Sequence, residues 1–267
     1  MSIERNDVSD WWRTEIIDMA PGIIRFRGHP IEDLIGNVSF AQMIWLMVRG
    51  GLPGAEEAAL FECALVAAVD HGPQAPSIAA SRMAVTCGLP LNSAIASAVN
   101  MLGDVHGGAG EQAVELYHMI DEAGGPAHAG EMIDRWQAER TPYVPGFGHR
   151  FHKPVDPRAP RLLALVDDAR EKGVVTGRFA AIGRAIQTEL NARKGKPVPM
   201  NIDGATAVIY AELGFAPPLA RGLFCLSRSV GILAHAWEQM NQGGRNKGPT
   251  PPKYRWTYDG PDPIGEK

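Results

Sequence analysis

Hydrophobic residues recur with helical spacing along most of this chain. Ser39 precedes apolar residues spaced three and four apart, which predicts a serine-capped helix that ends near Gly50. The same reasoning predicts further helices over 55–69, 92–105 (capped by Asn92), 111–122 and 130–140, one starting at Asp156-Pro157-Arg158, one containing Phe179 to Leu190, one starting after Asp203, and one from Pro217 to about Gln242.

Strand patterns are scarce. The run from Gly22 to Gly28 alternates apolar and basic residues between glycines, which predicts one strand of a small hairpin. Roughly ten helices and little or no sheet predict an all-α protein.

Proline-rich turns divide the predicted helices into groups. Boundaries near 142–145 and 195–199 predict a large helical domain of residues 1–142 and 196–242, with a smaller helical subdomain, residues 143–195, inserted in it. Both boundaries flank candidate site residues, as a closing cleft requires. Residues 243–267 are rich in proline and glycine, which predicts an extended C-terminal arm. Its tyrosines and tryptophan offer apolar area to bury on this subunit or a neighbouring one.

Composition excludes several classes of function. The 267 residues are 45% hydrophobic and 21% charged, as in ordinary globular proteins. A net charge of -4 and a pI near 6.1 argue against nucleic acid as the main partner. The most apolar stretch, 58–69, is interrupted by Glu62 and is too short to span a membrane. There is no Cys-x-x-Cys pair and no signal-peptide pattern, so we expect a cytoplasmic protein without a metal site.

Three short runs carry the candidate chemistry. Gly-Asp-Val-His-Gly-Gly places His106, Val-Pro-Gly-Phe-Gly-His-Arg places His149, and Asn-Ile-Asp-Gly places Asp203, each beside glycine or proline near a helix end. Two imidazoles and a carboxylate are suited to making or breaking a carbon–carbon bond next to a carbonyl. One group moves the carbon-bound proton, one holds the enol and one polarises the partner oxygen. The alternatives are a helix C-cap for His106, a surface loop for His149 and a helix N-cap for Asp203.

Positive charge gathers around His149. The loop formed by Pro145, Gly146 and Gly148 admits a ligand closely, and Arg150 and Lys153 add charge suited to an acidic or phosphorylated ligand. Three other residues are candidates for binding substrate carboxylates. They are His71, Arg158 and Arg228.

Arg228 lies in a very apolar helix, where a guanidinium must find an anion or face water. A structural carboxylate is the alternative partner to a substrate. A capping role is the alternative for His71, and His235 is interpreted as a buried structural imidazole.

Taken together, these runs resemble the citrate synthase superfamily, and the resemblance extends from the Gly-His-Pro-Ile-Glu-Asp-Leu segment at 28–34 to Arg228 and beyond. It implies a citrate synthase-like fold. It also implies that His106 holds the acetyl-CoA enol, that His149 binds the carbonyl or hydroxyl oxygen of the four-carbon acid, and that Asp203 moves the methyl proton. Arg158 and Arg228 would bind carboxylates.

Within the superfamily, Asp70-His71-Gly72-Pro73 and the run from Gly103 to Ala109 resemble citryl-CoA lyases and the cleavage module of ATP-citrate lyase. Synthases more often carry Asp-His-Glu at the first place and are longer. The preferred interpretation is a lyase that splits citryl-CoA into acetyl-CoA and oxaloacetate. The alternatives are a citrate or 2-methylcitrate synthase, an enzyme for another 3-hydroxy-3-carboxy acid, and a non-catalytic paralogue.

The resemblance also implies ligands and partners. Coenzyme A, as part of the substrate, would lie along the loop at 145–153, with Arg150 and Lys153 near its phosphates. Arg245 or Arg255 would close the site of a neighbouring subunit. We expect a homodimer or larger assembly, built on the apolar helices at 92–105 and 223–240.

Overall fold

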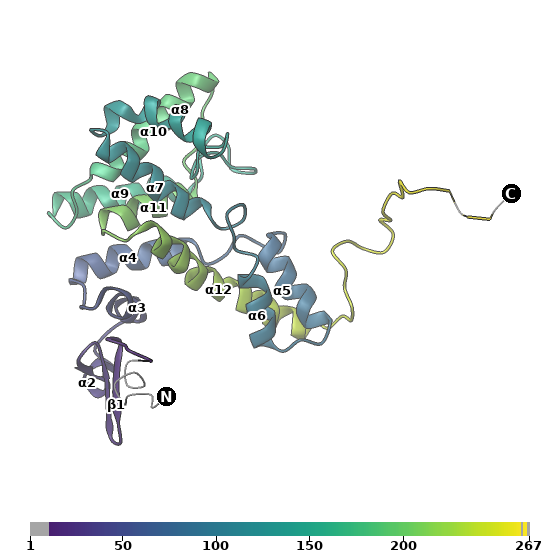
Figure 1. The fold of residues 1–267 in the computed structure, drawn as a ribbon, viewed down its shortest axis with the longest axis horizontal. Helices are drawn as coiled ribbons and strands as arrows, with labels where there is room; N and C mark the ends of the chain where they lie inside the picture. The colour runs from purple at the N-terminus through teal and green to yellow at the C-terminus, as the bar shows by residue number, and fades with distance from the viewer. Residues whose placement is uncertain (1–10, 263, 266–267) are drawn as a thin grey trace, which may run out of the picture.

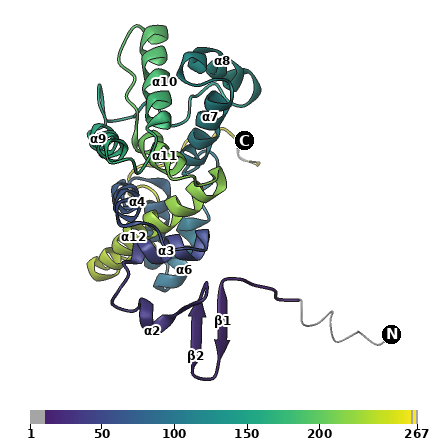
Figure 2. The same cartoon turned by 90° about the vertical axis from the view of Figure 1, so that its left-hand side faces the viewer.

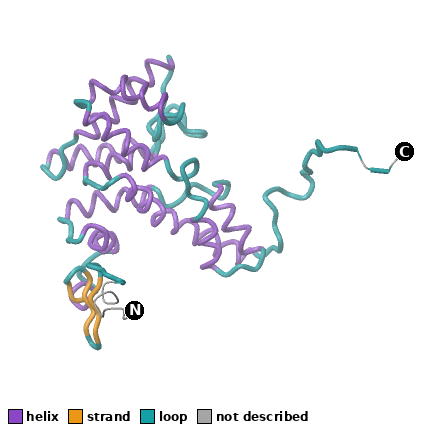
Figure 3. The backbone as a smooth tube through the Cα atoms, viewed as in Figure 1, coloured by secondary structure: helices purple, strands orange, loops and turns teal. Residues whose placement is uncertain are grey.

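A computed structural model describes residues 11–262, 264 and 265. The first ten residues of the predicted large domain, and residues 263, 266 and 267 of the predicted arm, lie outside the described part. The prediction of an all-α fold is confirmed, because helices dominate and the one sheet described is small (Figure 3).

The sheet lies near the N-terminus and contains the predicted hairpin. Strands β1 (Ile17–Ala20), β2 (Ile23–Phe26) and β3 (His29–Pro30) pair antiparallel in that order, and the one-turn helix α2 (Ile31–Leu34) follows. The sheet stands to one side of the helices (Figure 2), and most of its side chains are exposed.

Helix ends follow local capping chemistry. The next helices are α3 (Phe40–Arg49), α4 (Ala55–Ala67), α5 (Pro76–Thr86) and α6 (Leu91–Val99). Ser39 caps α3 as predicted, in a capping box with Gln42, and Gly50 ends it in the left-handed conformation.

From residue 109 onward, the named elements of the described chain are all helices. They are α7 (Ala109–Glu122), the 3-10 turn η1 (Pro126–His128), α8 (Ala129–Glu139), α9 (Arg158–Glu171), α10 (Arg178–Lys194), α11 (Ile202–Glu212) and α12 (Pro217–Gln242). The bounds of α12 match the prediction, since proline occupies its first turn and Gly243 ends it.

In the first half, one prediction is wrong and one helix was not predicted. Helix α6 begins at Leu91 after Pro90, so Asn92 lies inside it and is not the cap, and it stops at Val99 instead of continuing to 105. Helix α5 was not predicted. Its weak amphipathic pattern explains this, because Ser77 and Ser81 are among its buried residues.

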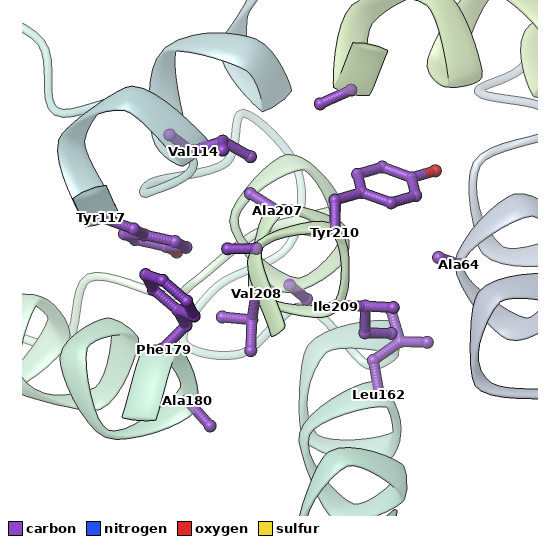
Figure 4. Close-up of a cluster of buried hydrophobic side chains, with 14 of the residues drawn as sticks. Ala64, Val114, Tyr117, Leu162, Phe179, Ala180, Ala207, Val208, Ile209 and Tyr210 are labelled. Atoms are coloured by element: carbon purple, nitrogen blue, oxygen red, sulfur yellow. The ribbon is translucent and has the colours of Figure 1, made fainter. Parts of the chain in front are cut away.

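The larger core surrounds α11. Tyr117 of α7, Leu162 of α9 and Phe179 of α10 point toward Val208 and Ile209 of α11 (Figure 4). Nine of the eleven residues of α11 are buried, and the other two are its acidic residues, Asp203 and Glu212, so the helix has little polar surface. Any side chain it presents at its N-terminus is therefore held by a rigid element.

A second, thinner group is formed by α5, α6 and the C-terminal half of α12, which extends away from the larger core (Figure 1). Its own buried cluster contains only four residues, Ala75, Ile78, Ala98 and Ile232. One side of α12 carries an apolar stripe that is between 42% and 58% exposed. The α12 stripe consists of Leu226, Val230, Leu233, Trp237 and Met240.

The C-terminal arm leaves the end of α12 and extends from the body (Figure 1). Its root is fixed to α5, because Asn246 N–H donates to Thr86 O (2.8 Å) and Lys247 N–H to Thr86 Oγ1 (3.0 Å). In the described part of the chain, no helix is long and apolar enough to cross a membrane.

The predicted subdomain boundaries stay a prediction. Helices α9 and α10, which would form the inserted subdomain, share the larger core with α7, α8 and α11.

Candidate active site

The loop that carries His149 is hydrogen-bonded to the turn that carries Asp203. Asn201 N–H donates to Gly146 O (2.9 Å), and the Asn201 side chain donates to Gly148 O (2.8 Å). The two candidate residues therefore belong to one locally rigid unit, since each peptide segment satisfies the polar groups of the other.

Glycine is required where these two segments touch. A Cβ at Gly204 would overlap Gly146 O, and a Cβ at Gly146, whose φ is +83°, would lie 2.5 Å from Gly204 Cα. Tyr117 Oη fixes the same turn from α7 by donating to Gly204 O (3.0 Å). The glycines of two of the predicted motifs thus have a packing reason, besides any contact with a ligand.

Asp203 lies in the first turn of α11 and does not cap it. Asn201 is the cap, since its Oδ1 accepts from Asp203 N–H (2.9 Å) and Gly204 N–H (3.3 Å). The carboxyl group of Asp203 is therefore not used to cap the helix. Burial raises the pKa of Asp203 above its ordinary value, and the nearby Arg228 and Arg158 charges only partly oppose this.

His149 has a fixed tautomer. Its Nδ1 accepts hydrogen bonds from the backbone N–H groups of Phe151 (3.0 Å) and His152 (2.9 Å). The neutral ring therefore carries its proton on Nε2. Burial lowers the pKa of His149, and the neighbouring His152 and Arg158 lower it further against the opposing effect of Asp156.

His71 meets His149 across the site, with ring centroids 5.4 Å apart and planes at 72°. It lies in the loop after α4. Burial lowers the pKa of His71, and the positive charges of Arg158 and Arg228 lower it further, as does His149. Four of the predicted residues thus converge on one region of positive potential, which suits a ligand with several carboxylates.

His106 lies in the loop between α6 and α7. Helix α6 ends seven positions earlier, at Val99, so the C-cap alternative does not hold. Its Nε2 accepts from Ser77 N–H (3.2 Å) and lies 3.0 Å from Ser77 Oγ, so the neutral ring carries its proton on Nδ1. Burial lowers the pKa of His106, and the positive charge of Arg228 lowers it further. Ser77 was missed, because it belongs to the helix that was not predicted.

Arg228 is only 3% exposed, yet no carboxylate pairs with it within the described residues. Its Nε donates to Ala68 O (3.0 Å), and its guanidinium lies 4.8 Å from the Phe224 ring centroid. Neither of the predicted alternatives, water or a structural ion pair, describes it. A buried guanidinium held by one carbonyl and one ring is suited to an incoming anion.

Arg158 is held by Asp156, a residue with no exposed surface. Its Nε donates to Asp156 Oδ1 (3.0 Å) and its terminal nitrogen to Oδ2 (2.8 Å). Burial raises the pKa of Asp156, but the bonds from Arg158 outweigh it and the pKa is lowered overall. The pair fixes the Arg158 side chain and neutralises part of its charge.

The predicted coenzyme A residues divide into two groups. Pro145 and Gly146 are buried and Gly148 is partly buried, whereas Arg150 and Lys153 are exposed beside them. A pocket of about 320 Å³ lies next to this loop, between α9, α10 and the residues Pro199 and Met200.

The C-terminal arginines are not brought to this site within the chain. Arg245 and Arg255 are exposed in the segment after α12 (Figure 1). In the part of the chain that is described, no three histidine, cysteine, aspartate or glutamate side chains gather as a metal site. The expectation of a metal-free site stays a prediction.

Comparison with known proteins gives the family. The family model described as "Citrate synthase, C-terminal domain" matches residues 5–67 and 54–250. Citrate synthase 2 of Bacillus subtilis is 32% identical over 237 residues, which cover 86% of this chain and 60% of that protein. The chain thus spans little more than half the length of the curated relatives it matches.

Two solved structures extend the comparison. Citryl-CoA lyase from Hydrogenobacter thermophilus is 31% identical, with a TM-score of 0.85 and coverage of 96% of this chain and 98% of that one. ATP citrate lyase from Methanothrix soehngenii, solved with citrate and coenzyme A, has a TM-score of 0.79 at 21% identity, covers all of this chain and matches 46% of that one, which shows the shared fold. The resemblance seen in the sequence is confirmed, and the chain belongs to the citrate synthase family.

Proposed function

We propose that this protein cleaves citryl-CoA to acetyl-CoA and oxaloacetate, or runs the reverse condensation. One observation carries the proposal: two imidazoles with opposite fixed tautomers lie around a carboxyl group of raised pKa and a buried guanidinium that pairs with no carboxylate of the described residues. Such a set supplies a proton donor for each of two oxygens, an acid-base group for carbon and a site for an anion.

The oxaloacetate part of the substrate would lie between His71, His149 and the two arginines. Arg158 and Arg228 bind its carboxylates, and His71 adds a further polar contact. In condensation, His149 donates its Nε2 proton to the ketone oxygen. The two N–H donors at Nδ1 stabilise the negative charge that the ring then gains. In cleavage, the same nitrogen takes the hydroxyl proton back.

The acetyl-CoA part would lie between His106 and Asp203. When the carbon–carbon bond breaks, its electron pair moves to the methylene carbon and forms the enolate of the thioester. The Nδ1–H of His106 donates to the enolate oxygen, while Asp203 in its acid form protonates the carbon. In condensation Asp203 is the base, so its raised pKa suits both directions.

Two observations favour a lyase over the alternatives. The motifs at 70–73 and 103–109 resemble those of citryl-CoA lyases, and the citryl-CoA lyase structure is matched over 98% of its length. A citrate or 2-methylcitrate synthase is the second candidate, because the curated relatives carry those names. A synthase must also hydrolyse the thioester with a positioned water. A non-catalytic paralogue is disfavoured, since His106, His149 and Asp203 are all present.

The proposed function also includes the assembly of two copies of the chain through the α12 stripe. The exposed α12 stripe repeats at intervals of four and three residues, which is the spacing of helix–helix seams. We propose that it packs against a second copy of the chain, with the C-terminal arm reaching across, so that Arg245 or Arg255 completes the neighbour's site. Coenzyme A would follow the loop at 145–153, with its phosphates near Arg150 and Lys153.

The product of the reaction with citryl-CoA tests this proposal. Malate dehydrogenase and NADH report oxaloacetate, and a thiol reagent reports free coenzyme A in parallel. Oxaloacetate without free thiol supports the lyase. Citrate with free thiol supports the synthase, and the absence of both products contradicts an action on citryl-CoA.

A further inference from the structure

The chain segment that leads to His71 lies along α12. Ser227 Oγ donates to Leu65 O (2.5 Å), and Arg228 Nε donates to Ala68 O (3.0 Å). The first bond anchors α4 itself, because Leu65 lies within that helix, and the second holds Ala68, three residues before His71. Its loop is therefore positioned by α12 as well as by its own helix, α4.

One turn further along α12, the two backbones are in direct contact. A Cβ at Gly231 would overlap Val69 O and would lie 3.0 Å from Asp70 Oδ1. Only glycine permits this approach. The approach brings Asp70 within reach of the next turn of α12.

The carboxylate of Asp70 connects the residue after His71 to α12. Its Oδ2 accepts from Gly72 N–H (3.1 Å), and its Oδ1 lies 3.2 Å from Nε2 of His235 on α12. Burial raises the pKa of Asp70, but the bonds from Gly72 and His235 outweigh it, so the pKa is lowered overall. His235, interpreted from the sequence as a structural imidazole, is thus connected to the candidate site through one carboxylate.

Arg82 of α5 decides which way His235 donates. Its terminal nitrogen lies 3.1 Å from His235 Nδ1. Because arginine can only donate, Nδ1 is the acceptor, and the ring proton resides on Nε2 and points to Asp70. Glu238 (2.6 Å) and Gln242 (2.8 Å) in turn hold the Arg82 guanidinium.

We infer that Arg82 and His235 are positioning residues for His71. They orient Asp70, and Asp70 fixes the Gly72 peptide group directly after His71, so that the His71 ring faces His149. The inference rests on the proposed function, in which His71 contacts the oxaloacetate part of the substrate. Neither Arg82 nor His235 contacts that region, so their effect reaches the substrate only through His71.

Calorimetric titration of oxaloacetate tests this inference without depending on turnover. We expect His235→Ala to weaken binding about tenfold, equivalent to about 1.4 kcal/mol. His235→Gln keeps a donor and an acceptor on one planar group and recovers most of the affinity. In the condensation assay with acetyl-CoA, kcat of His235→Ala changes less than KM for oxaloacetate, because the lost interaction positions a residue that binds this substrate.

A double-mutant cycle separates positioning from general stability. If His235 acts through His71, then His235→Ala causes no further loss of affinity in a His71→Ala background. Ser227→Ala is the matched control, since it removes a bond between α12 and the body of α4 without touching Asp70 or the loop of His71. It is expected to lower the Tm and leave oxaloacetate affinity unchanged.

The outcomes are distinct. Additive losses in the cycle, or an equal loss of affinity in Ser227→Ala, overturn the positioning role and leave the proposed function intact. A wild-type protein that binds no oxaloacetate overturns the proposed function, and with it this inference. Circular dichroism of each variant shows whether it is folded. If His235→Ala does not fold, His235→Gln still tests the positioning role.

Discussion

The two halves of the candidate site are supported very differently. His149 and Asp203 lie on segments packed against the large core around α11, and backbone hydrogen bonds join them. His71 and His106 are held instead by α5 and α12, whose shared cluster contains four buried residues and whose outer face is apolar and exposed. The first half is supported by the large core, whereas we expect the second half to gain further support from the second copy that we propose to cover the α12 stripe.

The largest effect is expected at Asp203. Asp203→Asn should lower the rates of cleavage and condensation by about 10²–10⁴-fold, because the acid-base group for carbon is lost. Initial rates with citryl-CoA measure this.

The same variant should be more stable at neutral pH. The folded pKa lies above the ordinary value of 3.8, so the native state binds this proton more tightly than the unfolded state does. The free energy of unfolding therefore falls as pH rises through that interval, and asparagine removes the penalty. Thermal melts should show a higher Tm near pH 7 and no gain below pH 3.8. A lower Tm at pH 7 would show that the carboxylate is structural.

The α12 stripe gives the next largest effect. Trp237→Asp places a charge in the proposed interface and should weaken self-association about 30-fold or more, as expected for an aromatic anchor worth about 2 kcal/mol. Sedimentation velocity measures the mass. Val66→Asp is the matched control, since Val66 is 63% exposed on α4, outside the stripe. Equal dissociation in both variants, or a monomeric wild type, would contradict the proposed interface.

A smaller effect is expected at the cap that joins the core-supported half. Asn201→Ala removes the α11 cap and the bond to Gly148 O, which should cost about 0.5–2 kcal/mol of stability and also lower kcat. Ser39→Ala removes a comparable cap from α3, away from the site. Its Tm should fall similarly while its kcat is unchanged. If both caps affect kcat equally, Asn201 has no special connection to the chemistry.

The smallest effect concerns the imidazoles. Burial and Arg228 lower the pKa of both His71 and His106. Arg228→Gln removes one cause, so both pKa values should move upward toward the ordinary value of 6.5, which histidine resonances in an NMR titration report. Unchanged values would mean that Arg228 lies too far from the rings to act on them.

Local sequence signals predicted a good part of this structure. Ser39, Pro217 and the glycine-bounded hairpin give their own element ends, because capping and turn chemistry depend on a few neighbouring residues. The helix at 76–86 could not be predicted in this way, since its buried serines make its pattern weak.

The site residues divide in the same way, into those with a local sequence signal and those brought together only by the fold. His106, His149 and Asp203 could be chosen from short motifs, but their partners could not. Ser77 is 29 residues from His106, and Ala68 is 160 residues from Arg228, so only the folded chain brings them together. The pairing of Asp70 with His235 depends likewise on the path of α12.

The proposed function requires that the two halves form one site for acetyl-CoA. Deuterium exchange into the acetyl-CoA methyl group tests this requirement, measured by NMR in D₂O with a four-carbon dicarboxylate that lacks a ketone. Exchange requires Asp203 from one half and His106 from the other. It does not depend on the direction of the overall reaction. We expect exchange in the wild type and its loss in both Asp203→Asn and His106→Ala. Exchange that persists in either variant would contradict a shared site for acetyl-CoA, and so would the absence of exchange in a wild type that binds both ligands.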